Sequence, residues 1–261
     1  IPLAHIKYKR CNTTAMKTYK IGNFNILEYE EMASTNTCAA EMPSNQLTDR
    51  MVILTWRQTQ GRGQVGNSWE SAPDSNISMT VVLKPERLEA SRQFAVSMVI
   101  ALGCFDFVSR YTDNVSVKWP NDIYVGNKKI AGILIEHKIT GMYIGNSICG
   151  VGLNVNQEHF LSDAPNPISL FQLISHPLPL QQALEELLSC IDARYAAIHD
   201  YATLEKEFLH HLYRGTGIHQ WEDARGRFRA SIAGMDEYGQ LRLLDEAGCE
   251  RLYAFKEVTY L

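Results

Sequence analysis

The sequence lacks the patterns that assign many proteins to a metal, P-loop or nucleic-acid class. The six cysteines are scattered and include no Cys-x-x-Cys pair, and no histidine pair has metal-ligand spacing. No Gly-x-x-x-x-Gly-Lys-Ser/Thr sequence occurs, which argues against a P-loop nucleotide site. The formal net charge of -4 at pH 7 argues against a protein whose main ligand is nucleic-acid phosphate.

Signals for membranes and export are also scarce. No apolar run reaches the ~20 residues that a membrane span needs, and the N-terminus lacks the apolar core of a signal peptide. Scattered cysteines of this kind are typical of reduced thiols. We therefore predict a soluble protein with cytoplasmic localisation and no membrane contact.

What is present is the ordinary composition of a folded chain. The 261 residues, 45% of them hydrophobic, suffice for a sizeable core and fit one large domain with a small appendage. Residues 1–20 are basic and lack periodicity, so we expect a disordered or non-native tail there. We expect the main domain at 21–213. Short alternating runs separated by turns predict a small antiparallel β-barrel at 214–261.

The main domain alternates between strand and helix patterns, which predicts the α+β class. Residues 24–29, 51–56 and 77–83 are β-prone, whereas 89–111 and 180–211 carry apolar residues at helical spacing. We expect a mixed or antiparallel sheet with flanking helices.

One predicted hairpin carries an unusual set of polar residues. Its first strand ends at Pro120, because proline donates nothing to a sheet ladder, and a Gly-Asn pair further on is typical of a hairpin turn. Four polar side chains are then expected near one rim: Lys118, Asn121, Asp122 and Lys129. Two cations beside an amide and a carboxylate suit a phosphate-bearing ligand, and merely solvated lysines are the plainer alternative.

A glycine-rich loop precedes the predicted strand at 77–83. The glycines from Gly61 to Gly66 match the Gly-x-Gly-x-x-Gly of dinucleotide sites, but a strand follows them where that site requires a helix. Such a loop can still wrap a carboxylate or phosphate around Arg62, since glycine permits close backbone approach and arginine offers a planar fork.

Two further polar segments allow either a structural or a binding interpretation. Residues 34–36 (Ser-Thr-Asn) open a predicted helix, where capping is the simpler role, although short polar side chains beside free N–H groups also make a small polar pocket. Gly150 and Gly152 interrupt a strand just before Asn154. They mark a bulge or a tight backbone contact, unless Asn154 faces the same ligand.

Taken together, these motifs resemble the catalytic core of biotin protein ligases over residues 25–261. The resemblance rests on five segments in order: Ser34-Thr-Asn36, Gln58-x-x-Gly-Arg-Gly-x-x-Gly-x-x-Trp69, Lys118-Trp-Pro-Asn-Asp122, Lys129-x-Ala-Gly-Ile-Leu134 and Gly150-x-Gly-x-Asn154. It implies a class II synthetase-like catalytic core with a C-terminal SH3-like β-barrel.

The resemblance also implies an activity. Biotin's carboxylate would attack the α-phosphate of ATP, pyrophosphate would leave, and a lysine amine of the biotin carboxyl carrier protein would attack the resulting biotinyl-5′-AMP. The implied small molecules are biotin as substrate and ATP with its Mg²⁺. No metal site built by the protein itself is expected.

Roles for single residues follow from the same resemblance. The residues implied in catalysis are Arg62, Lys129, Lys118 and Asp122. The residues implied in binding biotin and ATP are Ser34, Thr35, Asn36, Gln58, Gly61, Arg62, Gly63, Trp69, Asn121, Lys129, Gly132 and Asn154. Arg62 would clamp the carboxylate and the phosphate, and Lys129 would bridge them. Trp69 would cover the adenine, and Asn154 would hydrogen-bond it.

Two positions depart from the resemblance. Gln64 and Asn67 stand where relatives often carry arginine, whose charge would help retain the acyl-adenylate. We hypothesise that loop ordering and the remaining cations hold the intermediate instead.

Rival interpretations concern the substrate and a second function. A lipoate ligase of the same fold is the first, although the Gly-Arg-Gly and Lys-Trp-Pro-Asn-Asp motifs favour biotin. A biotin-sensing repressor is the second, but only about 24 residues precede the core, below the ~50 of a folded domain, so DNA binding is not expected. A catalytically dead biotin-binding module is disfavoured because Arg62 and Lys129 are both present. Whether the protein is a homodimer is left open.

Overall fold

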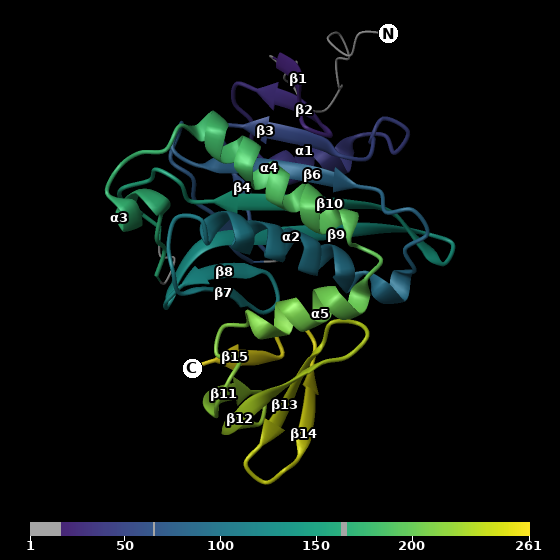
Figure 1. The fold of residues 1–261 in the computed structure, drawn as a ribbon, viewed down its shortest axis with the longest axis vertical. Helices are drawn as coiled ribbons and strands as arrows, with labels where there is room; N and C mark the ends of the chain where they lie inside the picture. Colours follow the sequence, from purple (N-terminus) through teal and green to yellow (C-terminus); the bar gives the residue numbers. More distant parts are fainter. Residues whose placement is uncertain (1–16, 65, 163–165) are drawn as a thin grey trace.

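The fold is built on an eight-stranded mixed sheet (Figure 1). The computed structural model of the protein describes residues 17–64, 66–162 and 166–261. Across the sheet the strands are β1 (Lys17–Ile21), β2 (Phe24–Tyr29), β3 (Met51–Thr55), β6 (Ile77–Leu83), β10 (Tyr143–Leu153), β9 (Lys128–Thr140), β8 (Asp122–Val125) and β7 (Val115–Lys118). β2 and β3 run parallel, and the other neighbouring pairs are antiparallel. The predicted α+β class with a mixed sheet is confirmed.

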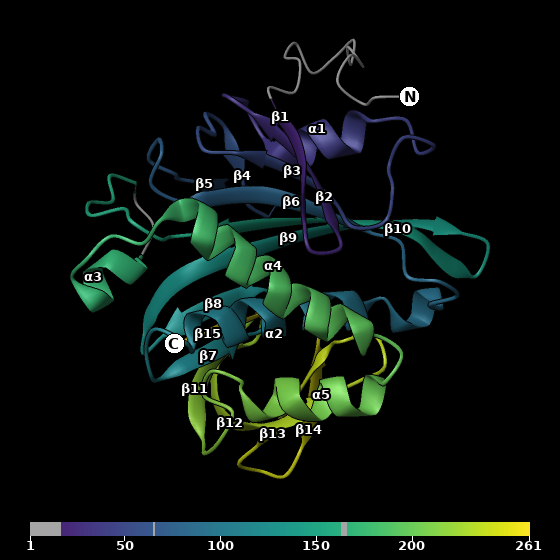
Figure 2. The ribbon, with the colours of Figure 1, turned by 45° about the horizontal axis from the view of Figure 1, so that its top comes forward.

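Helices flank both faces of this sheet. α2 (Phe94–Val108) and α4 (Leu180–Ala196) lie on one face, and α1 (Thr35–Glu41) lies on the other (Figure 2). Gly103 lets α2 and α4 approach closely, because a Cβ there would lie 2.8 Å from Ile191 Cγ1. α2 and α4 therefore cover one face of the sheet, and the polar segments lie on the other face, beside α1.

Shorter elements fill the connections. β4 (Gly61–Arg62) pairs with β5 (Ser68–Trp69) in the glycine-rich loop, and a 3₁₀ turn (Ala90–Arg92) precedes α2. α3 (Leu170–Ile174) lies in the connector after β10, and α5 (Tyr201–His210) follows α4. The helical pattern at 180–211 thus corresponds to two helices.

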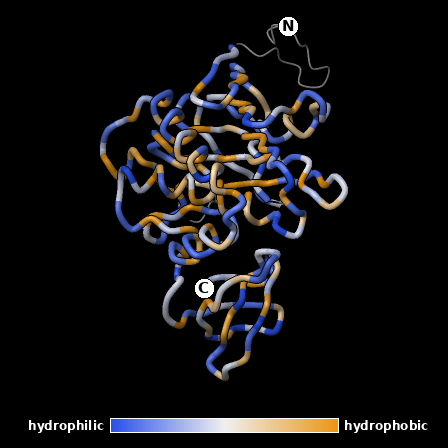
Figure 3. The backbone as a smooth tube through the Cα atoms, turned by 45° about the vertical axis from the view of Figure 1, so that its right-hand side comes forward, coloured by the Kyte–Doolittle hydropathy of each residue, from blue (hydrophilic) through white to orange (hydrophobic). Residues whose placement is uncertain are grey.

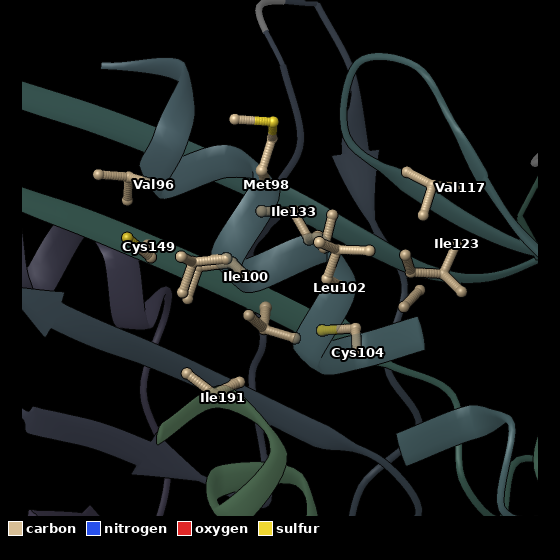
Figure 4. Close-up of a cluster of buried hydrophobic side chains, with 14 of the residues drawn as sticks. Val96, Met98, Ile100, Leu102, Cys104, Val117, Ile123, Ile133, Cys149 and Ile191 are labelled. Carbon is tan, nitrogen blue, oxygen red and sulfur yellow. The ribbon is translucent and has the colours of Figure 1, made fainter. Parts of the chain in front are cut away.

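The largest core cluster lies around α2, which packs against the sheet and beside α4. Figure 4 shows apolar side chains from these elements together: Val96, Met98, Ile100, Leu102, Cys104, Ile133, Cys149 and Ile191. By length and composition alone, residues 90–108 would suffice to cross a membrane, although the sequence predicted that no apolar run is long enough for a span. Because 67% of that apolar window is buried in the structure, the segment is a core helix.

The N-terminal boundary differs from the prediction. Residues 17–20 were assigned to the tail, but they form most of β1, which pairs with β2 from Lys17↔Glu28 to Ile21↔Phe24. Ladder hydrogen bonds and the contact of Tyr19 Oη with Glu28 Oε2 at 2.8 Å stabilise this edge strand. The rest of the predicted tail, residues 1–16, lies outside the described residues.

The C-terminal residues form a second sheet. Its five antiparallel strands are, in order, β14 (Glu250–Tyr253), β13 (Leu241–Asp245), β12 (Gly226–Met235), β11 (His219–Asp223) and β15 (Val258–Tyr260). Hydrophilic and hydrophobic residues alternate along these strands (Figure 3), as expected for a sheet with one buried face. The predicted small antiparallel β unit is thus found as a five-stranded sheet, in which no pair between β14 and β15 closes the barrel among the described strands. β11 was not predicted.

The second sheet is fixed to the main one by aromatic side chains. The buried Trp119 donates its Nε1 hydrogen to Gly239 O at 2.9 Å, and the rings of Phe94 and Phe255 lie 6.3 Å apart. A Cβ at Gly239 would lie 2.2 Å from Phe94, so the turn holding Gly239 packs directly on the start of α2. Trp119 belongs to the same segment as the polar hairpin, which links the two sheets near the predicted site.

Candidate active site

A cavity of about 120 Å³ opens on the α1 side of the large sheet. Its walls come from the start of α1, the glycine-rich loop, the β8–β9 hairpin and the middle of β10. The predicted site residues that line it are Ser34, Thr35, Asn36, Gln58, Arg62, Gly63, Trp69, Asn121, Asp122, Lys129 and Gly132. Four of the five motifs, far apart in sequence, therefore meet at one place, together with Gly150 and Gly152 of the fifth.

A buried polar network fixes the α1 wall. Ser34 caps the helix by accepting from Thr37 N at 3.4 Å, so the capping interpretation is confirmed for this residue. The Thr80 hydroxyl lies 2.6 Å from Asn36 Oδ1, and Asn36 Nδ2 donates to Leu134 O at 3.1 Å. The helix start is thereby bound to β6 and β9 across the sheet.

Close backbone approach explains a glycine beneath this wall. A Cβ at Gly150 would lie 2.2 Å from Asn36 Oδ1, so α1 requires glycine at that point of β10. From the opposite side, Gln58 Oε1 accepts from Thr35 N at 3.0 Å. The backbone at the helix start and the loop are thus held in one fixed arrangement.

Trp69 lies flat across two other glycines. A Cβ at Gly152 would lie 2.3 Å from its indole ring, and one at Gly132 would lie 2.9 Å from it. The buried Trp69 Nε1 has no hydrogen-bond partner among the described residues. A buried donor of this kind is costly unless a ligand or solvent satisfies it, so the indole is suited to contact a bound molecule.

Two cations face the cavity from different walls. Lys129 Nζ lies 2.7 Å from Asp122 Oδ1 and 5.7 Å from the centre of the Trp69 ring. Arg62 Nη1 donates to Thr37 Oγ1 at 3.2 Å, and Arg62 Nη2 lies 3.5 Å from Glu136 Oε1. Partly exposed ion pairs contribute only about 0–1 kcal/mol each, so both cations can change partners at little cost.

The structure places three predicted site residues off the cavity wall. Gly61 supports the loop instead, since a Cβ there would lie 2.3 Å from Trp69 O. Asn154 is buried, donates Nδ2 to Ile168 O at 3.0 Å, and keeps an Oδ1 without a partner among the described residues. This oxygen could accept a hydrogen bond only if a ligand reached past the present wall.

Lys118 is the third of these residues and lies among tyrosines. Its Nζ is 3.1 Å from Tyr124 Oη, 4.8 Å from the Tyr124 ring centre and 5.1 Å from that of Tyr260. Burial lowers the pKa of Lys118, which nearby Asp122 opposes. Lys118 therefore connects the polar hairpin to the C-terminal sheet and does not reach the cavity.

Several wall residues were not predicted. They are Ser68, Met79, Ile133, Leu134 and Val151, together with Gln64 and Asn67, noted only as departures from the resemblance. Residues two apart on a strand share a face, so Gly132 on the site face implied Leu134 and then Glu136. This alternation along β9 was the sequence signal that could have predicted Leu134 and Glu136.

A larger groove of about 810 Å³ adjoins this cavity. It runs between the large sheet and the C-terminal sheet, and Phe94 and Phe255 contribute to its walls. Seven residues line both spaces: Arg62, Gly63, Gln64, Asn67, Asn121, Ile133 and Leu134. The two spaces are therefore parts of one continuous site.

The fold has counterparts among solved structures. It matches a solved structure of biotin protein ligase from Aquifex aeolicus in complex with biotin and ATP, with a TM-score of 0.73 and 20% identity over 90% of this chain and 97% of that one. A biotin protein ligase from Leishmania major in complex with biotinyl-5-AMP matches with a TM-score of 0.61 and 19% identity over 88% of this chain and 98% of that one. At such identities the likeness shows the fold.

Sequence comparison places the chain more closely. The model of the biotin/lipoate A/B protein ligase family matches residues 29–154. The bifunctional ligase/repressor BirA of Bacillus subtilis is 26% identical over 92% of this chain and 75% of that relative, and a biotin–[acetyl-CoA-carboxylase] ligase of Paracoccus denitrificans is 32% identical over 47% of this chain and 51% of that relative. Over residues 29–154 the chain is thus similar to the biotin/lipoate A/B protein ligase family, and over most of its length it is similar to the bifunctional ligase/repressor BirA.

Proposed function

We propose that this protein is a biotin–protein ligase that activates biotin with ATP to biotinyl-5′-AMP and transfers biotin to a lysine of a biotin carboxyl carrier protein. The observation that carries the proposal is the convergence of Arg62, Lys129, Asp122 and Trp69 on one cavity. The named functions of the relatives, biotin–protein ligases among them, support it.

The proposed chemistry needs proximity and charge stabilisation. Negative charge develops on the α-phosphate when a carboxylate attacks it, and Lys129 and Arg62 are the cations placed to stabilise that charge. Ser34, Thr35 and Gln58 are proposed to hold the polar part of biotin, and the Trp69 ring to cover the adenine. No covalent intermediate with the protein is required.

Mg²⁺ is proposed to enter with the phosphates of ATP. Asp122, in the wall beside Lys129, is the carboxylate of the cavity that such an ion or its water would meet. Among the described residues, no group of three or more His, Cys, Asp and Glu side chains is arranged to hold a metal. The ion's chemistry would be to screen the phosphate charges.

Carrier labelling tests the proposal directly. The protein is incubated with biotin, Mg-ATP and an apo carrier domain, and the carrier is analysed by mass spectrometry. The expected result is addition of one biotinyl group to one carrier lysine, dependent on ATP. Absence of labelling, with lipoate accepted in place of biotin, would overturn the proposal in favour of a lipoate-type ligase.

Cytoplasmic localisation remains part of the proposal. Five cysteines of the described residues are free thiols, four of them buried, which fits a reducing compartment. The predictions concerning a homodimer and DNA binding stay predictions.

A further inference from the structure

The groove beside the cavity is not needed to explain how biotin and ATP are held, and its position suggests a role in the second step of the reaction. It is lined by α2, β9 and the C-terminal sheet, and it shares seven wall residues with the cavity. A second substrate that attacks a molecule held in the cavity can approach through this groove. For the proposed function, that substrate is a lysine side chain on another protein.

Glu136 gives this groove its negative charge. Among the described residues that line the groove, Glu136 carries the sole carboxylate, whereas Arg62 and Lys256 are cationic. Glu136 follows Gly132 and Leu134 at period two along β9, so it extends the site face of that strand into the groove.

The two carboxylate oxygens of Glu136 are used unequally. Oε1 lies 3.5 Å from Arg62 Nη2, at the long end of an ion pair, and both side chains are partly exposed, at 41% and 47%. Oε2 is buried and has no hydrogen-bond partner among the described residues. A buried acceptor without a partner is costly, so a rotation of the partly exposed Glu136 side chain that presents Oε2 to a cationic donor in the groove is favourable.

We propose that Glu136 binds the ammonium group of the acceptor lysine, in exchange for Arg62. This inference rests on the proposed function. Once adenylate forms, its phosphate is the better partner for Arg62, because a guanidinium binds phosphate with two parallel hydrogen bonds. Arg62 then leaves Glu136, and the carboxylate is free to receive the lysine.

The transfer step forms an amide bond to the lysine and releases AMP. The bound ammonium loses one proton through the Glu136 carboxylate to solvent, and the amine lone pair attacks the carbonyl carbon of the mixed anhydride. A C–N bond forms, the C–O bond to phosphate breaks, and AMP leaves with that electron pair. The nitrogen gives its second proton to solvent, which leaves a neutral amide.

The movement of Arg62 from Glu136 to the phosphate also favours adenylate formation before lysine binding. While Arg62 occupies Glu136, an approaching ammonium meets a cation and a carboxylate that is already paired. After adenylate formation the same ammonium meets a free carboxylate. Because a partly exposed pair of this kind is weak, its release favours lysine binding by up to about fivefold once an adenylate is present to attack.

Two nucleophiles distinguish this role from adenylate formation. Hydroxylamine is small and mainly neutral at pH 7, so it captures the adenylate without a carboxylate to bind it, whereas a carrier lysine arrives as a cation. The measurement is the ratio of carrier biotinylation to biotin hydroxamate formation, in the full-length protein with biotin and Mg-ATP. The variants are Glu136→Gln, Glu136→Asp and, as matched control, Glu185→Gln on the exposed face of α4.

In Glu136→Gln the ratio is expected to fall about tenfold, the effect of removing one charge-assisted hydrogen bond. Glu136→Asp keeps the charge and should recover part of the ratio, and Glu185→Gln should leave it unchanged. Glu136→Ala replaces Glu136→Gln if thermal melting shows that the latter does not fold.

Either of two results would overturn the inference: an unchanged ratio in Glu136→Gln, or an equal loss of both products, which would place Glu136 in adenylate formation. A wild-type protein that makes neither product with biotin would instead overturn the proposed function.

Discussion

His137 is a half-buried histidine in the wall of the groove. Its Nδ1 lies 2.8 Å from Ser147 Oγ on β10, and burial lowers its pKa from 6.5 to about 4. The unfolded chain binds a proton at this histidine below about pH 6.5, whereas the folded protein binds it only near pH 4. The unfolded state therefore holds more protons in this window, and the stability falls as the pH falls.

His137→Gln should remove this pH dependence. As the pH decreases from about 6.5 to about 4, the wild type is expected to lose up to about 3 kcal/mol of unfolding free energy that the variant keeps, while glutamine can retain the hydrogen bond to Ser147. Urea denaturation at several pH values measures the difference. Parallel curves for the two proteins across this range would contradict the account.

At the scale of single residues, the sequence predicted which residues belong to the site better than it predicted what their side chains contact. The motifs predicted that Gly150 and Gly152 mark a bulge or a tight contact, and the structure shows tight contacts, with Asn36 and Trp69 respectively. Lys118 belongs to a motif but its side chain leaves the cavity for a cluster of tyrosines. The direction of a side chain next to a strand end depends on what packs beside it, here the C-terminal sheet.

Among the elements, the loop between β4 and β5 decides how the site holds an intermediate. Gln64 lines both the cavity and the groove, and Gly63 N donates to Asn67 O at 3.0 Å within the loop. Neither side chain brings a positive charge to the wall, so Arg62 and Lys129 are the wall cations in the described part of the chain.

Gln64→Arg should slow release of the acyl-adenylate. A guanidinium at this wall position adds a charge-assisted contact to the phosphate, for which we expect an off-rate about fivefold to tenfold lower. A pulse of labelled biotin with ATP followed by an unlabelled chase measures the rate. Gln60→Arg, at an exposed position just before β4 that is not in the wall, is the control. An off-rate that Gln64→Arg leaves unchanged would exclude a role for position 64.

Element positions were largely predictable, because periodicity and turn residues act locally. Residues 24–29 and 77–83 match β2 and β6, and the hairpin after Pro120 is β8–β9. The edge strand β1 was missed because it is basic and mostly exposed, with no alternation strong enough to mark a buried face. Its stability comes from pairing with β2, which local sequence does not reveal.

At the scale of the whole molecule, the contact between the large sheet and the C-terminal sheet, which we call the joint, determines the shape of the groove. Trp119 lies in the segment that leads into Asp122, and its hydrogen bond to Gly239 O is buried. The groove that we assign to the acceptor has walls from both sides of this joint. Movement of one sheet against the other would therefore change the groove more than the cavity.

Trp119→Phe should weaken the joint. The variant leaves the Gly239 carbonyl buried without its donor, at a cost of about 1–3 kcal/mol in unfolding free energy. Chemical denaturation measures this cost, and hydrogen exchange should rise around Gly239. Trp221→Phe, which removes the bond from Trp221 Nε1 to Ala230 O inside the C-terminal sheet, is the matched control and should raise exchange in β12 instead. Unchanged exchange near Gly239 would show that the contact does not hold the joint.

The arrangement of the two sheets is what the sequence could not supply. Short alternating runs predicted a small antiparallel barrel, and the described strands form an antiparallel sheet in which the three-residue β15 pairs with β11 alone. The groove follows from packing between parts that are more than a hundred residues apart. No local sequence pattern predicts contacts between segments so far apart in the chain.

The central claim is that the cavity between α1, the glycine-rich loop and β9 forms an acyl-adenylate. Biotin-dependent exchange of labelled pyrophosphate into ATP measures that step without any carrier. Wild type should catalyse exchange, and Lys129→Ala should lose it about 100-fold or more, because a donor to the developing phosphate charge is removed. Lys128→Ala, the exposed neighbour outside the wall, should retain it.

Stability separates this result from simple unfolding. A partly exposed lysine contributes within about 0.5 kcal/mol to the core, so Lys129→Ala should melt as the wild type does. The account predicts a folded Lys129→Ala protein without biotin-dependent exchange. A folded Lys129→Ala protein that exchanges pyrophosphate at the wild-type rate would contradict it.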